Sequence, residues 1–88
     1  MSVVYVIELQ DDSLYVGRTN LTREQRILNH MNGHKSARIV KKLGVKRQRD
    51  DLIPESWLKD LDYEMSHLGE KVVAHLLRED GYVVHGGH

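Results

Sequence analysis

The N-terminal part of the chain has the pattern of apolar and turn-forming residues that is typical of a β-hairpin. Residues 3–9 (VVYVIEL) are largely apolar and β-branched, and residues 14–17 (LYVG) resume this pattern. Between these runs, Asp11, Asp12 and Ser13 favour a turn. Two strand-like runs on either side of a short turn are expected to pair as neighbouring strands.

A first helix is predicted over residues 23–31. Thr22 is a good N-cap for this helix. Ile27, Leu28 and Met31 follow at helical spacing, so we expect them to lie together as its apolar face.

Two further helices and a last strand follow along the chain. A short helix is predicted from about residue 35 to residue 43, before Gly44. A long helix is predicted from about residue 63 to residue 80, and Gly81 closes it. Residues 82–84 (YVV) resemble a strand. The order of these elements describes a small α+β domain.

Residues 45–61 form the least regular part of the sequence. Pro54 interrupts this stretch, and residues 56–58 (SWL) fit either a helical turn or a short strand. Sequence pattern leaves both interpretations open.

The length and composition fit one small domain. A chain of 88 residues forms a single domain with a thin core. The chain has no cysteine, which excludes disulfides and thiolate metal sites. No apolar run approaches the roughly 20 residues needed to span a bilayer, and the start has no basic leader. We therefore expect an intracellular protein, cytoplasmic or associated with the nucleoid, that has no membrane partner.

The charges balance overall but are unevenly distributed. With 13 basic and 13 acidic side chains the net charge is zero, which argues against a general high-affinity DNA coat. Residues 35–49 nevertheless hold seven bases and no acid, and acids dominate residues 50–64. This distribution would orient a polyanion on one face of the protein, or it is simply a solvated helix surface.

Four residues of the hairpin and the first helix are candidates for chemistry. Arg26 and His30 are four residues apart, so their side chains share a face of the predicted helix. Tyr5 and Tyr15 lie on different strands of the hairpin and can point to the same face. Taken singly, such residues are more often surface or packing residues than catalytic ones.

Glu70 is the most unusual residue of the long predicted helix. On a helical wheel, Val73, Ala74 and Leu77 all lie within about 60° of it. A carboxylate inside an apolar stripe is costly unless it is paired, hydrogen-bonded or bound to a metal. The alternative is a glutamate at the edge of the stripe that reaches water.

Taken in order, these motifs resemble the GIY-YIG nuclease superfamily, which includes phage homing endonucleases, some restriction enzymes and the excision-repair incision subunit. The resemblance runs through most of the chain, and we expect residues 1–88 to form a single domain of this type. The matching positions are residues 4–6 (VYV), residues 14–19 (LYVGRT), Arg26 with His30, residues 36–37 (SA), and Glu70. The family's first motif begins with Gly-Ile, where this chain has Val3 and Val4. Each motif is weak alone, but their order and spacing together are specific.

The resemblance implies a metal-dependent endonuclease that hydrolyses a phosphodiester bond in a nucleic acid, which we take to be DNA. Glu70 would hold one Mg²⁺ or Mn²⁺ ion, and Arg26 would clamp the phosphate. Tyr5, with Tyr15 close by, would deprotonate or orient the attacking water. His30 is the competing base, because an ordinary histidine pKa suits that role better. The sequence does not choose between Tyr5 and His30.

The resemblance also implies a set of substrate-binding positions. Gly17 would let the substrate approach the backbone, and Arg18 would add a phosphate contact. We assign His34, Lys35 and Ser36 to substrate binding as well. His30 and His34 are four residues apart, but no third ligand of regular spacing completes a zinc motif.

The resemblance further implies a small mixed sheet, made of the hairpin and one further strand and flanked by helices. Residues 45–48 or 52–57 are candidates for that strand, and residues 82–84 would replace it or add an edge. We weigh two alternative functions, a nucleic-acid-binding module without activity and a protein-interaction domain. Because the catalytic core fills the chain, specificity would come from substrate shape, from a homodimer or from a separate targeting partner.

Overall fold

The predicted hairpin lies at the centre of a four-stranded sheet in the computed structural model, which describes residues 1–87. Strands β1 (Val3–Leu9) and β2 (Leu14–Thr19) pair antiparallel. Strand β3 (Val45–Gln48) pairs antiparallel with β1, and β4 (Val84–Gly86) pairs parallel with β2. The strand order is β3-β1-β2-β4. The α+β class is confirmed, and the mixed sheet has one strand more than expected.

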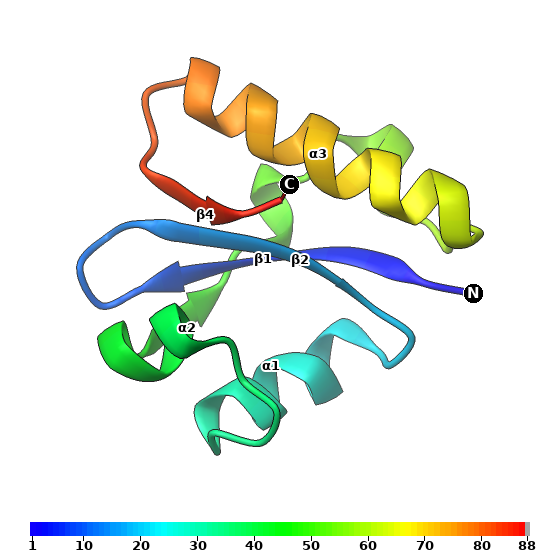
Figure 1. Ribbon diagram of the computed structural model, residues 1–88. Coiled ribbons are helices and arrows are strands. Elements are labelled where there is room, and N and C mark those ends of the chain that lie inside the picture. Colours follow the sequence, from blue (N-terminus) through cyan, green and yellow to red (C-terminus); the bar gives the residue numbers. More distant parts are fainter. Residues whose placement is uncertain (88) are drawn as a thin grey trace.

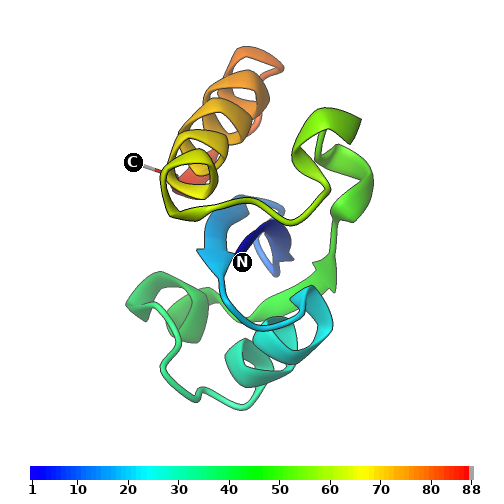
Figure 2. The same cartoon turned by 90° about the vertical axis from the view of Figure 1, so that its right-hand side faces the viewer.

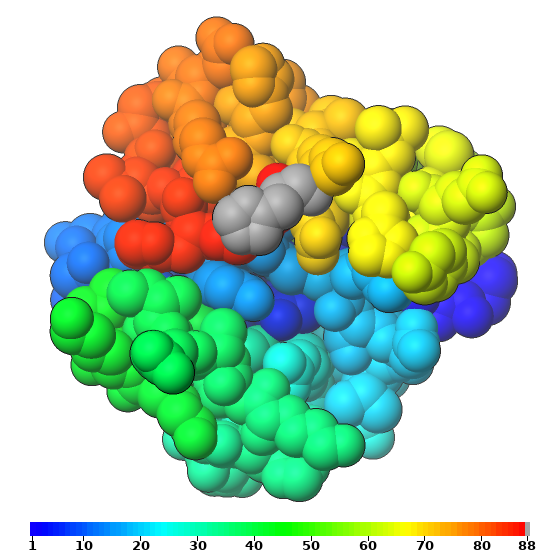
Figure 3. Space-filling model, in the orientation of Figure 1, coloured from blue at the N-terminus to red at the C-terminus, as the bar shows by residue number. Residues whose placement is uncertain are grey.

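Helices cover both faces of this sheet (Figures 1 and 2). Helix α3 (Tyr63–Glu79) lies on one face, whereas α1 (Arg23–Met31) and α2 (Arg38–Leu43) lie on the other. In the space-filling view, the surfaces of α3, β2 and the α1–α2 layer adjoin on one side of the molecule (Figure 3). A residue of β1 or β2 can therefore contact either helical layer, depending on the direction of its side chain.

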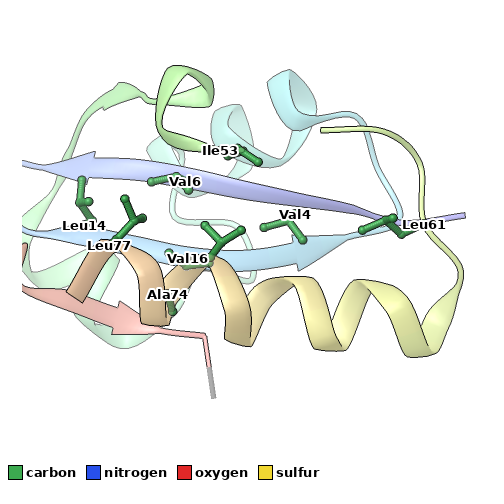
Figure 4. Packing of buried hydrophobic residues seen from close by; sticks show 9 residues of the cluster. Val4, Val6, Leu14, Val16, Ile53, Leu61, Ala74 and Leu77 are labelled. Atoms are coloured by element: carbon green, nitrogen blue, oxygen red, sulfur yellow. The ribbon is translucent and has the colours of Figure 1, made fainter. Parts of the chain in front are cut away.

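Each face of the sheet has its own apolar core. The core under α3 consists of Val4, Val6, Leu14, Val16, Ile53, Leu61, Val73, Ala74 and Leu77 (Figure 4). The core under α1 and α2 consists of Tyr5, Ile7, Leu9, Ile27 and Val40. Side chains alternate between the faces of a strand, so β1, which is buried along its whole length, contributes to both cores.

Helix α1 begins as predicted but buries a different face. Thr22 accepts a hydrogen bond from the Gln25 backbone amide, and the Gln25 side chain returns one, which completes a capping box. The buried residues of α1 are Ile27 and His30. Leu28 and Met31 are 55% and 63% exposed. The expected apolar face was therefore wrong in two of its three members, because the buried face of α1 is partly polar.

Arg23 explains part of this polar packing. Its Nε donates to the carbonyl oxygen of Val4 at 2.7 Å, and its Nη2 donates to the carbonyl oxygen of Leu58 at 2.7 Å. One side chain thus connects α1 to β1 and to the irregular segment before α3 through two backbone carbonyls. Nothing in the sequence pattern distinguished Arg23 from a surface base.

Two element boundaries differ from the prediction. Helix α2 begins at Arg38 rather than near residue 35, because Lys35 has a φ of +49°, in the left-handed region that ends or excludes a right-handed helix. Strand β4 begins at Val84 rather than at residue 82. It is an extra edge strand and does not replace the third strand.

In the structure, residues 45–57 contain one strand and two short helical turns. Residues 45–48 form the third strand. Two 3₁₀ turns, η1 (Asp50–Leu52) and η2 (Glu55–Trp57), occupy the segment around Pro54. Residues 52–57 are therefore not a strand, and the helical-turn interpretation of the Trp57 segment is confirmed.

Helix α3 agrees with its predicted bounds to within one residue. The Asp62 side chain caps it by accepting from the Met65 amide. At Gly69, an added Cβ would lie only 2.7 Å from the Trp57 ring and 3.1 Å from Val4, so the glycine allows close packing of the helix. Within residues 1–87, no helix has the length and hydropathy needed to cross a membrane.

Candidate active site

Three of the predicted catalytic side chains form a cluster between the sheet and α1. Tyr5 and Tyr15 point to the same face of the hairpin, and their ring centroids are 6.2 Å apart. The His30 ring lies 5.6 Å from Tyr5 and 5.7 Å from Tyr15. Tyr5 Oη and His30 Nε2 are 2.8 Å apart, within hydrogen-bond distance. We refer to Tyr5, Tyr15 and His30 as the ring cluster.

Gly17 makes room for the Tyr5 ring of this cluster. Gly17 lies opposite Tyr5 in the β1–β2 register. A Cβ added at residue 17 would lie 2.5 Å from Tyr5 Oη and 2.6 Å from Cζ, closer than atoms can approach. The sequence predicted that Gly17 would admit the substrate to the backbone, and in the structure the Tyr5 phenol makes that close approach.

Replacing Gly17 with alanine is expected to displace the Tyr5 ring and to lengthen its hydrogen bond to His30. Overpacking of this kind lowers the free energy of unfolding by about 1–3 kcal/mol, which denaturant unfolding measures. In a Tyr5→Ala background, the same substitution should cost much less, because the clashing ring is gone. An equal cost in both backgrounds would show that the strain lies elsewhere.

Arg26 lies beside the ring cluster and holds the loop that follows α1. Its Nη2 donates to the carbonyl oxygen of Lys35 at 3.0 Å, and its Nη1 is 3.5 Å from the carbonyl oxygen of His34. The side chains of His34 and Lys35 are exposed. The positive charge of Arg26 favours the ionised form of both tyrosines and therefore opposes the rise of their pKa. Arg26 is thus close to the phenols as well as to the loop.

Ser36, at the end of this loop, contacts the ring cluster from the side opposite Tyr5. Its Oγ lies 2.7 Å from His30 Nδ1. Both ring nitrogens of His30 therefore have hydrogen-bond partners, Tyr5 on one side and Ser36 on the other. The sequence placed Ser36 among the substrate contacts and missed this contact, since spacing alone does not show it.

Glu70 approaches the same cluster from the other helical layer. It lies on α3, is half-buried, and is followed by the buried residues Val73 and Ala74. Its negative charge contributes to raising the pKa of both Tyr5 and Tyr15, so the carboxylate is within electrostatic reach of the two phenols. The structure therefore brings Glu70 and the hairpin tyrosines into one region, although they belong to different layers.

Burial sets the protonation states of the cluster. Desolvation, followed by the neighbouring Tyr15, raises the pKa of Tyr5 to about 12. Desolvation likewise raises the pKa of Tyr15. Burial, followed by the charge of Arg26, lowers the pKa of His30 to about 4. At neutral pH the tyrosines are protonated and His30 is a neutral imidazole.

The lowered pKa of His30 predicts a dependence of stability on pH. Above the ordinary histidine pKa of 6.5, neither the folded nor the unfolded state is protonated at this residue. As the pH falls from 6.5 to about 4, only the unfolded state takes up the proton, so the free energy of unfolding decreases by up to about 3 kcal/mol. Below pH 4 the decrease stops.

Urea unfolding between pH 7.5 and pH 4 measures this decrease, with His30→Gln as the matched control. The variant has no imidazole at this position, so its stability should fall less over the same range. An NMR titration in which the His30 ring protonates near pH 6.5 would contradict the assignment.

Glu70 fits a hard divalent cation. Among the residues that the structure describes, no three His, Cys, Asp or Glu side chains gather to form a protein cage for a metal. Mg²⁺ does not need such a cage, because it binds through one or two carboxylates and keeps several waters. A single carboxylate near two phenols is therefore a suitable donor for Mg²⁺ or Mn²⁺.

Arg18 lies away from the ring cluster. It is paired with Val4 in the β1–β2 register, so it points to the α3 face of the sheet. Its guanidinium lies 4.9 Å from the centre of the Tyr63 ring, and Nη1 is 3.4 Å from Ser2 Oγ. A phosphate contact from Arg18 would therefore reach the substrate from the α3 side, opposite Arg26.

The basic segment divides into two parts with different surroundings. Three bases at β3 surround the Glu8 carboxylate of β1, namely Lys46 at 3.3 Å, Arg47 at 2.9 Å and Arg49 at 2.6 Å. Hydrogen bonds from Arg47 and Arg49 lower the pKa of Glu8 to about 2. Glu8 is almost fully buried. These bases hold β3 against β1, a role signalled in the sequence only by an acid inside the apolar run 3–9.

The other four bases of this segment are exposed. Within the described chain, no ion pair involves the side chains of Lys35, Arg38, Lys41 and Lys42. They lie on α2 or in the loop before it, on the same side of the sheet as His30. These bases therefore form a positive surface on the side of the sheet that holds the ring cluster.

A comparison with protein families agrees with this fold. The GIY-YIG catalytic domain matches residues 1–67, a segment that contains the ring cluster and Arg26, whereas Glu70 lies just beyond its end. No curated protein and no solved structure matches the chain significantly. Because the matched segment covers most of the 88 residues, the chain belongs to the GIY-YIG family of nucleases.

Proposed function

We propose that this protein is a metal-dependent endonuclease that hydrolyses a phosphodiester bond in DNA. The observation that carries the proposal is the arrangement around the ring cluster. Tyr5 and His30 are hydrogen-bonded to each other, Arg26 lies beside them, and the charge of Glu70 acts on Tyr5 and Tyr15 from the opposite layer.

Arg26 is suited to bind the scissile phosphate. A guanidinium group has five N–H donors, and two are directed to the carbonyls of the loop after α1. The guanidinium also hydrogen-bonds to the Tyr5 phenol. The donors that remain match the oxygens of a phosphate, and the charge is permanent. Arg26 would therefore stabilise the negative charge that builds up on the phosphate during attack.

Tyr5 and His30 would act together on the attacking water rather than as rival bases. With a pKa of about 12, Tyr5 alone is a poor proton acceptor at neutral pH, since it already holds its proton. His30 Nε2 is 2.8 Å from Tyr5 Oη and can accept that proton. Tyr5 would then take the proton of the water as it releases its own to His30.

Glu70 would hold the divalent ion of the site. When bound there, Mg²⁺ or Mn²⁺ would supply positive charge at the scissile phosphate and at the leaving oxygen. The exposed bases of α2, Arg38, Lys41 and Lys42, would bind the nucleic-acid backbone next to the cleaved bond. Together with the zero net charge of the chain, this favours weak binding that is not selective for sequence.

A cleavage panel tests the proposal. The protein is incubated with supercoiled plasmid, branched DNA, single-stranded DNA and RNA, in Mg²⁺, in Mn²⁺ and in EDTA. Nicking that requires the metal supports the nuclease. Binding without cleavage would instead support a nucleic-acid-binding module, and the absence of both would support a protein-interaction domain.

A further inference from the structure

The two hydrogen bonds of the His30 ring determine which of its nitrogens carries the proton. The ring is neutral at pH 7, so one nitrogen is a donor and the other is an acceptor. Tyr5 Oη and Ser36 Oγ contact the two nitrogens at 2.8 Å and 2.7 Å. The donor and acceptor roles of the two partners therefore decide the tautomer together.

Tyr5 favours one tautomer, because its own proton needs an acceptor, but that tautomer is stable only if the proton on the other ring nitrogen has an acceptor too. The phenol is 2% exposed and keeps its proton at neutral pH. The structure places His30 Nε2 at hydrogen-bond distance from Tyr5 Oη, and a buried hydroxyl without an acceptor is costly. Nε2 is therefore the acceptor nitrogen, and Nδ1 carries the proton. That proton needs an acceptor, which is Ser36 Oγ.

Ser36 does not have the usual structural role of a serine before a helix. The N-cap of α2 is Ala37, and no side chain caps this helix. The loop that carries Ser36 is held by Arg26, which donates to the Lys35 carbonyl, and Lys35 has a φ of +49°. A backbone conformation that is unfavourable for lysine is thus maintained directly before Ser36.

We propose that Ser36 is a positioning residue for the reaction, which accepts the Nδ1–H of His30 and so keeps the Nε2 lone pair directed at Tyr5. The proposal rests on the proposed nuclease function. In the reaction, the O–H bond of the water breaks and Tyr5 Oη gains that proton. The water oxygen then bonds to phosphorus, and the P–O bond to the leaving oxygen breaks, so that the leaving oxygen takes the electron pair of that bond. The original Tyr5 proton moves to Nε2, and Ser36 stabilises the resulting imidazolium through Nδ1–H. In this arrangement His30 is the base, and Ser36 is the third group that orients it.

The tautomer of His30 is a direct test, because it needs no catalytic turnover. Nitrogen-15 chemical shifts of the ring distinguish the protonated from the lone-pair nitrogen. We expect the Nδ1–H form in the wild-type protein, a shift towards the Nε2–H form in Ser36→Ala, and its reversal in Ser36→Thr. Ser56→Ala, a substitution at an exposed serine, is the control and should leave the ring unchanged. An Nε2–H form in the wild type, or an unchanged ring in Ser36→Ala, would overturn the proposal.

Kinetics separate positioning from substrate contact. Ser36→Ala should lower kcat by about 10- to 100-fold, less than the 10²- to 10⁴-fold of a whole general base, with KM nearly unchanged. Ser36→Thr should restore kcat. A raised KM with an unchanged kcat would make Ser36 a substrate contact and overturn the positioning role. If the wild type cleaves no substrate, the proposed function is wrong. The tautomer measurement still shows whether His30 Nδ1 donates to Ser36 Oγ.

Discussion

Replacing Glu70 with glutamine is expected to lower the rate of Mg²⁺-dependent cleavage by about 10³-fold or more. Glutamine keeps the size of the side chain but removes the negative charge that would hold the cation. A metal ion contributes several kcal/mol to the stabilisation of a phosphoryl-transfer transition state, and each 1.4 kcal/mol corresponds to about tenfold in rate. Single-turnover cleavage of a plasmid at saturating Mg²⁺ measures the loss.

Glu79→Gln is the matched control, because Glu79 lies on the same helix and pairs with the exposed His75. This variant should cleave at the wild-type rate. Mn²⁺ binding, followed by electron paramagnetic resonance, should weaken in Glu70→Gln alone. Full activity of Glu70→Gln, or a Mn²⁺ ion located away from residue 70 in a soaked crystal, would refute the metal assignment.

Replacing Arg26 with alanine is expected to lower kcat by about 10²- to 10³-fold while DNA affinity changes only a few-fold. The guanidinium would act mainly as charge develops on the phosphate, so its loss affects the transition state more than the bound substrate. The exposed bases of α2 remain in the variant and would continue to hold the backbone. Rapid-quench rates and fluorescence-anisotropy binding curves separate the two effects.

Arg26 also holds the loop before α2, so Arg26→Ala would alter this loop as well as remove the charge. Arg26→Lys helps to separate the two effects. Arg26→Lys keeps a positive charge near the phenols but cannot donate to two loop carbonyls and a phosphate in the same way. We expect it to recover only part of the lost rate. Equal losses of affinity and turnover in Arg26→Ala would assign Arg26 to substrate binding rather than to catalysis.

The elements that follow from local pattern were predicted correctly from the sequence. The hairpin, the Thr22 cap and the long helix that carries Glu70 each depend on residues adjacent in the chain. The apolar stripe around Glu70 is confirmed by the burial of Val73, Ala74 and Leu77. Strands, helices and helix caps can be predicted from a sequence because they depend on the spacing and type of residues that are close together in the chain.

Features that depend on tertiary contact were not predicted. Leu28 and Met31 resemble core residues, but the sheet offers α1 polar partners, so His30 is buried in their place. The second helix begins later than predicted, because Arg26 holds the Lys35 carbonyl and the Lys35 backbone has a left-handed conformation. The tight contact between Gly17 and the Tyr5 ring likewise depends on strand register, which the residue order does not reveal.

The position of Glu70 on the far side of the sheet has a consequence for evolution and engineering. The distance between the proposed cation and the phosphate clamp is determined by how tightly α3 sits on β2, through residues such as Ala74 and Val16. Enlarging Ala74 would push the two halves of the catalytic machinery apart without altering any reacting group. Turnover by the proposed nuclease should therefore respond to changes in the hydrophobic interior, and variants selected for faster cutting should carry substitutions there as well as among the exposed bases of α2.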